Sequence, residues 1–192
     1  MKTGKTSRTY GTEAELLEAL RQSRHHDRRQ WVFIPHLRVG SGFGYGMRLG
    51  GHTLYDQVPN PLDRVEQTID AWAMDLWPSH NFKKIAYEAK VSRADFFHEL
   101  ERPQKREAAM LLSNRFYFVV PAALVSVQEV PDDCGLIYVY DTQCRTMRES
   151  PRRAGPEPTW AFISSVLRRG LEEPGRVYLE EPNSTSEGPH PL

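Results

Sequence analysis

Five short apolar runs rich in β-branched and aromatic residues constrain the fold of this chain more than any other feature. They cover residues 31–34, 68–74, 83–90, 116–120 and 136–140. Each run is bounded by proline, glycine or a polar turn, which is typical of strands. Helical spacing of apolar residues appears instead near residues 12–24, after Ser92 and from Trp160 to Gly170. The order α-β-β-β-α-β-β-α predicts an α/β domain whose mixed central sheet is flanked by helices.

The length of 192 residues fits one domain with tails. We expect a flexible N-terminus over residues 1–11, a single domain over 12–179 and a disordered tail over 180–192. Residues 40–61 hold many glycines and no periodicity, so they predict a long loop. The Arg-, Pro- and Gly-rich stretch 145–158 predicts a linker before the last helix.

Composition excludes several classes of protein. Lys plus Arg and Asp plus Glu both number 25, so the chain has no uniformly basic surface for nucleic acid, although a local basic groove remains open. No stretch approaches the roughly 20 apolar residues of a membrane span, and we expect a cytoplasmic protein with no membrane association. Two cysteines, Cys134 and Cys144, match no zinc pattern and are expected to be reduced.

Three charged residues fall inside predicted strands. Glu88 and Lys90 are two residues apart, so their side chains should share one face of a strand. If Asp70 lies at the same height on the adjacent strand, all three groups converge. Charges among apolar neighbours are costly unless they are paired or bind metal. Two carboxylates suit Mg²⁺, which promotes phosphodiester hydrolysis. A lysine can orient or deprotonate the attacking water, or neutralise charge that develops on the phosphate.

An ordinary explanation of the same residues remains open. Glu-x-Lys is a common tripeptide, and a surface strand with one salt bridge would also contain it. The strand context and the upstream Asp70 favour the functional interpretation.

Several stretches together resemble the PD-(D/E)XK nuclease superfamily and, within it, the MmcB-like DNA-repair nuclease families, which are often phage or actinobacterial. They are WVFIPHLRVGSG at 31–42, IDAWAMDLWPS at 69–79, YEAKVSRADFF at 87–97, NRFYFVVP at 114–121 and CGLI at 134–137. The resemblance extends over about residues 12–140, with an enlarged loop before Asp70. It implies a restriction-endonuclease-like αβββαβ core and a metal-dependent DNA endonuclease of DNA repair or phage DNA processing.

Site residues follow from that resemblance. Asp70 and Glu88 would bind Mg²⁺ or Mn²⁺, and Lys90 would complete the catalytic set. Many members add an acidic residue from the first helix; Glu15 and Glu18 are the candidates here, and we favour Glu18. Related sequences often have an acidic residue where this chain has His36, which could ligate Mn²⁺ or simply pack or face solvent.

The expected partner is DNA. Arg38, Arg93, Lys105 and Arg115 are candidate contacts to its backbone, although charged runs are often only solvated faces. Dimerisation is common among nucleases that cut two strands, so a homodimer is one candidate state. Two alternatives stay open: a non-catalytic DNA-binding or repair-accessory protein on the same fold, favoured by His36, and a protein-interaction module. Binding through phosphates would weaken steeply with salt, which separates the two.

Overall fold

The computed structural model describes residues 10–39, 48–49, 52–53, 67–141, 143–154, 158 and 160–171. The predicted tail at 180–192 lies outside the described residues. So does the predicted loop at 40–61, apart from a pair of two-residue strands, β2 (Arg48–Leu49) and β3 (His52–Thr53). Among the described helices, none is long and apolar enough to cross a membrane.

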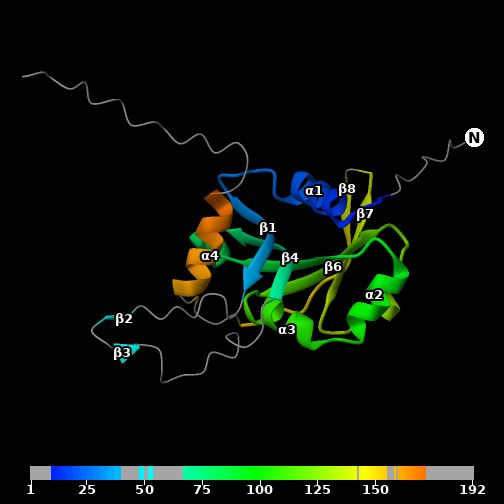
Figure 1. Ribbon diagram of the computed structural model, residues 1–192. Coiled ribbons are helices and arrows are strands. Elements are labelled where there is room, and N and C mark those ends of the chain that lie inside the picture. Colours follow the sequence, from blue (N-terminus) through cyan, green and yellow to red (C-terminus); the bar gives the residue numbers. More distant parts are fainter. Residues whose placement is uncertain are drawn as a thin grey trace, which may run out of the picture.

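A six-stranded mixed sheet forms the centre of the domain (Figure 1). Its strands are β1 (Trp31–Val39), β4 (Gln67–Asp75), β5 (Lys84–Ala89), β6 (Arg115–Pro121), β7 (Gly135–Tyr140) and β8 (Gln143–Arg148), in the order β1-β4-β5-β6-β7-β8. The pairs β5–β6 and β6–β7 are parallel and the other pairs are antiparallel. The predicted α/β class with a mixed sheet flanked by helices is therefore confirmed.

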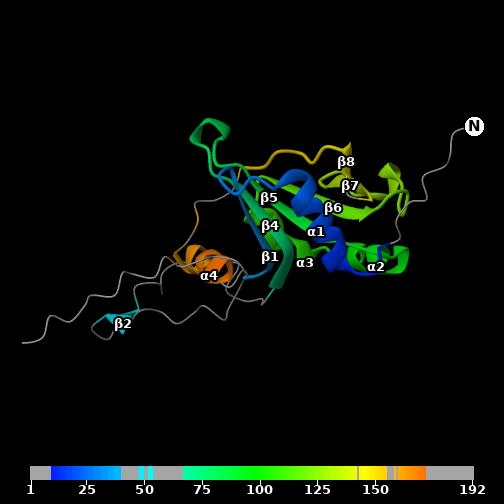
Figure 2. The same cartoon turned by 90° about the horizontal axis from the view of Figure 1, so that it is seen from above.

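Four helices and two 3-10 turns complete the described structure. They are α1 (Glu13–Arg24), α2 (Arg93–Leu100), α3 (Gln104–Leu111), α4 (Trp160–Leu171), η3 (Pro78–His80) and η4 (Val127–Glu129). Helix α1 packs on β5 to β8, α3 packs on β4 to β6, and α4 packs on β1 (Figure 2). The chain order α1-β1-β4-β5-α2-β6 is the order that the sequence predicts.

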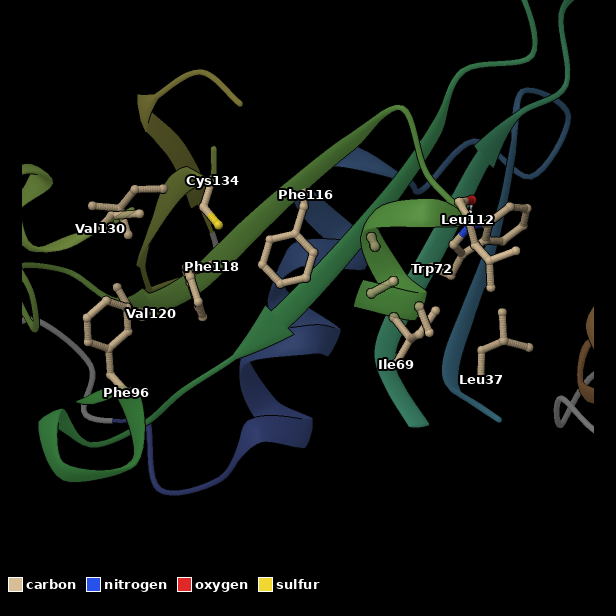
Figure 3. Close-up of a cluster of buried hydrophobic side chains, with 14 of the residues drawn as sticks. Leu37, Ile69, Trp72, Phe96, Leu112, Phe116, Phe118, Val120, Val130 and Cys134 are labelled. Atoms are coloured by element: carbon tan, nitrogen blue, oxygen red, sulfur yellow. Dashed lines mark hydrogen bonds between the residues drawn. The ribbon is translucent and has the colours of Figure 1, made fainter. Parts of the chain in front are cut away.

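The larger of two cores lies between the sheet and helices α2 to α4 (Figure 3). Trp72 is buried in this core, and its indole Nε1 donates a hydrogen bond to the carbonyl of Leu112 at 3.0 Å. Phe96, Phe116 and Phe118 pack edge to face along the same surface. The smaller core lies under α1, so both faces of the central strands are covered, as their nearly continuous apolar sequences require.

Helix α1 begins where its capping signal predicts. The Thr12 hydroxyl accepts the N–H of Glu15, and the Glu15 carboxylate accepts the N–H of Thr12, which makes a capping box. Leu16, Leu17 and Leu20 then form the buried stripe that holds the helix on the sheet.

Two predicted boundaries are wrong. Strand β8 occupies residues that the sequence analysis assigned to a linker from 145, because its outward side chains are polar and its strand pattern is weak. Tyr10, placed in the flexible N-terminus, is buried in the core under α1, so the ordered domain begins before residue 12.

Gly135 is required where β7 begins. A Cβ atom at this position would lie 2.3 Å from the ring of Tyr117 and 2.8 Å from the backbone nitrogen of Ser150. We expect Gly135→Ala to lower the free energy of unfolding by about 1–3 kcal/mol, because backbone must move to relieve the overlap. Gly11→Ala is the matched control, since its Cβ would meet nothing closer than 3.7 Å. Equal urea midpoints for the two variants would contradict this account.

Candidate functional site

Asp70 lies at an irregularity in β4. The side chains of Ile69 and Ala71, two residues apart, pack in different cores, although alternation would put them on one face. Across the ladder on β1, pairing is interrupted at His36, which has a left-handed φ of 51°. The matched break turns the Asp70 side chain out of regular alternation without changing the register of the two strands.

Strand β5, on the other side of β4 from β1, also departs from regular pairing beside Asp70. The β4–β5 ladder ends at the pair Ala71 and Tyr87. The next free amide, that of Ala89, donates to Asp70 Oδ2 at 2.9 Å. The carboxylate thus replaces a main-chain acceptor and fixes the point at which the two strands separate.

Lys90 joins the charged residues of the site. Its Nζ lies 2.6 Å from Glu88 Oε1, 3.8 Å from Asp70 Oδ2 and 3.6 Å from Glu13 Oε1. The side chains of Lys90, Glu88 and Asp70 are 10%, 15% and 17% exposed, whereas Glu13 is 40% exposed. The structure therefore brings Asp70 to Glu88 and Lys90, the two residues that strand alternation placed on one face, with the more exposed Glu13 at the rim.

The acidic residue that α1 contributes is Glu13, so the choice of Glu18 is wrong. Glu18 is exposed on another face of the helix and accepts hydrogen bonds from Arg21 and Gln22. Five residues turn an α-helix by about 500°, which separates positions 13 and 18 by well over a right angle. Only the docking of α1 decides which of its acidic positions faces the sheet.

A fourth carboxylate, that of Glu99 on α2, was missed. It is 7% exposed and lies near enough to raise the pKa of both Asp70 and Glu88. One sequence signal could have found it: Glu99 follows Phe96 by three residues, so an acidic residue occupies the buried face of α2.

Burial and mutual repulsion shift the carboxyl groups in the same direction. Desolvation first, and then the charge of Asp70, raises the pKa of Glu88 to about 8. Desolvation also raises the pKa values of Asp70 and Glu13. Burial opposes the charge of Lys90, but the adjacent Glu88 and Asp70 outweigh it and raise the pKa of the ammonium. The site therefore holds more negative charge than its one ammonium neutralises.

This donor set fits a hard divalent cation in chemistry. Carboxylate oxygens are the ligands that Mg²⁺ prefers, and a dication would relieve the repulsion that raises the carboxyl pKa values. In the arrangement shown by the described residues, no three acidic, histidine or cysteine side chains are grouped closely enough to hold a metal. The ammonium of Lys90 lies among the carboxylates, where it neutralises part of the negative charge that a bound metal ion would otherwise neutralise.

Two predicted DNA contacts are engaged in ion pairs. The Arg93 guanidinium bonds to the Glu129 carboxylate and to the carbonyl of Leu124, and it lies over the ring of Phe97. Arg115, the first residue of β6, bonds to the Glu149 carboxylate and to the carbonyl of Ser150, at the other end of the strand from the carboxylates around Lys90. Both remain predictions as DNA contacts.

The remaining candidates are exposed. His36 and Arg38 lie on β1, and His36 is close enough for its charge to lower the pKa of Asp70. Lys105 lies in the first turn of α3. The role of His36 as a metal ligand stays a prediction, as do the DNA contacts of Arg38 and Lys105.

Comparisons with known proteins identify no family. A scan against protein-family models finds no match, and a search of curated proteins finds none. One solved structure, described as the SPO1766 protein of unknown function from Silicibacter pomeroyi, aligns over 81% of each chain with 14% sequence identity and a TM-score of 0.47. These values do not bear on activity.

Protonation of Glu88 should make stability depend on pH. Because its folded pKa of about 8 exceeds the ordinary glutamate pKa of 4.5, this group stabilises the folded state most at low pH, and that contribution is lost as pH rises through about 8. We expect the metal-free protein to lose about 2 kcal/mol of unfolding free energy between about pH 6 and pH 9 relative to Glu88→Gln. Urea unfolding in the presence of a chelator measures the unfolding free energy of the wild type and of Glu88→Gln at each pH. A constant difference between the two proteins would contradict the raised pKa.

Proposed function

We propose that this protein is a metal-dependent nuclease that hydrolyses phosphodiester bonds in DNA. The observation that supports the proposal most directly is the buried group of Asp70, Glu88 and Lys90, with Glu13 at its rim. Buried charge of this kind is costly to maintain and is most often kept for function. The resemblance to PD-(D/E)XK nucleases adds the substrate class to that chemistry.

Asp70 and Glu88 would hold Mg²⁺ or Mn²⁺, and Glu13 is placed to add a third oxygen ligand. When bound, the cation would polarise the phosphodiester and acidify a water molecule. Asp70 is already oriented by the amide of Ala89, whereas Glu88 must be deprotonated before it can ligate. Metal affinity should therefore increase with pH up to about 8.

Lys90 would serve as the group that acts on the attacking water and the phosphate. In the structure its ammonium is held by Glu88 at 2.6 Å. Once a dication neutralises that carboxylate, the ammonium is available to orient the water or to offset charge that develops on a phosphate oxygen. Its raised pKa keeps it protonated near neutrality, so these two roles are favoured over that of a general base.

The direct test is nicking of supercoiled plasmid in the presence of Mg²⁺ or Mn²⁺. Glu88→Gln and Lys90→Met should each reduce the rate at least about 100-fold, since each removes a group that acts on the reacting phosphate or its metal. Glu88→Gln should also abolish Mg²⁺ binding measured by calorimetry.

Glu18→Gln is the matched control for acidic substitutions, and it should retain both cutting and Mg²⁺ binding because Glu18 faces away from the site. Glu13→Gln should weaken Mg²⁺ binding several-fold. If the folded wild type cuts neither plasmid nor single-stranded or branched DNA, the catalytic proposal fails, and the accessory DNA-binding role on the same fold takes its place.

A further inference from the structure

The turn between β4 and β5, residues 76–83, lies at the end of the sheet opposite the carboxylates. Figure 2 shows it as the green loop that projects beyond the strands, away from α2. Asp70 and the end of β4 at Asp75 are five residues apart, which spans about 17 Å along a strand. Whatever this turn contacts is therefore separate from the groups around Lys90.

Two aromatic rings are exposed on this turn. Trp77 is 52% exposed, and Phe82 is 43% exposed. The ring of His80 stacks beside Trp77 with an interplanar angle of 19° and a centroid distance of 6.2 Å. Because the carboxylate of Asp75 accepts bonds from the amide of Trp77 and from His80 Nδ1, the base of the turn is held in place.

The backbone at Phe82 is strained. Asn81 and Phe82 have φ values of 56° and 46°, both in the left-handed region. Asn tolerates this conformation, but for Phe it costs free energy because its Cβ comes too close to the following carbonyl oxygen. An exposed ring returns little of that cost through packing, whereas glycine would avoid it. Strain maintained to expose an aromatic ring indicates that the ring has a contact outside the chain.

Five cationic residues lie at the end of this turn or on segments whose backbones adjoin it. They are Arg28, Arg29, Lys83, Lys84 and Arg152. Among the described residues, none of the five lies within ion-pair distance of a carboxylate. Two acidic residues lie on the same segments: Asp27, whose carboxylate accepts the N–H of Arg29, and the buried Asp75.

Hydrogen bonds place these segments side by side. The amide of Leu76 donates to the carbonyl of Gln30, so the loop containing Arg28 and Arg29 adjoins the turn. Lys83 Nζ lies 5.2 Å from the ring of Trp31. Asn114 links the backbone segments that contain Lys84 and Arg152. Its side-chain oxygen accepts the amide N–H of Lys84, and its carbonyl accepts the amide N–H of Arg153, the residue after Arg152.

We propose that this distal patch, made of Trp77, Phe82 and the five cations, binds single-stranded nucleic acid. Unpaired bases would stack on the two exposed rings, and the cations would contact the phosphates between them. A duplex conceals the faces of its bases, so it would use the cations alone. An acidic peptide would likewise contact the cations but would offer no planar aromatic group to stack on the rings.

Binding of a single strand at the distal patch does not depend on cleavage by the carboxylates. If the carboxylates cut DNA, the patch would hold the strand a few nucleotides from the scissile bond. If they do not, the patch would still bind. For this reason the test is made in chelator, where the metal-dependent reaction is absent and failure of one proposal leaves the other standing.

The experiment measures fluorescence anisotropy of a labelled oligothymidylate of about 15 nucleotides. Trp77→Ala and Phe82→Gly should each weaken binding about tenfold. Phe82→Gly also relieves the left-handed strain, so it should unfold at the same or a higher urea concentration than wild type, and weaker binding by it cannot be attributed to misfolding. Arg28→Gln combined with Arg29→Gln should weaken binding and lower the dependence of affinity on salt.

Matched controls come from other surfaces of the domain. Trp160→Ala removes a 75% exposed indole from α4, and Arg145→Gln removes an exposed cation from β8; neither should change the affinity. An oligouridylate of the same length tests DNA against RNA as the source of the strand, and binding of either supports the proposal. Equal binding of blunt duplex, preference for polyglutamate, or full affinity in Trp77→Ala and Phe82→Gly would overturn it.

Discussion

The ammonium of Lys90 is the constraint on which the rest of the site depends. Three carboxylates approach it within 4 Å, and a fourth acidic group on α2 adds to the negative charge. Without a cation, these groups could not be kept together with so little exposure to water. Helix α1, strands β4 and β5 and the start of α2 all converge at this point. Their packing on the two cores supplies the stability that offsets the cost of the buried charge.

Regular sheet geometry would not produce this site. Asp70 is available because β4 breaks its alternation there and because its carboxylate takes the amide of Ala89. The left-handed His36 on β1 matches the break from the other side. Within the β1–β4 ladder, the break therefore falls at the height of the sheet where the charged groups meet, and regular pairing resumes on either side.

Strand polarity also gives the domain two chemically different ends. The carboxylates gather at the C-terminal end of β5, while the cations and exposed rings gather before its N-terminal end. The formal charge of zero does not reveal this difference, because a sum over the sequence says nothing of where the charges lie in space.

Alternation alone predicted that Glu88 and Lys90 project together, and the structure agrees because β5 is regular at that point. The same method failed for α1. The sequence located the helix and its cap, but the phase that puts Glu13 rather than Glu18 on the sheet comes from the docking of the buried leucines. Strand β8 was missed because half of its side chains face solvent.

The sequence by itself determined the order of elements, the α/β class and the pairing of a glutamate with a lysine on one strand, since these depend on local periodicity and on apolar burial. Tertiary structure decided which acidic side chains surround Lys90, how far their pKa values rise, and which cations share a surface with Trp77 and Phe82. Those properties depend on distances between segments that are remote in the chain. Such distances are set by the break in β4, the docking of α1 and the junction of the turn with the loop before β1.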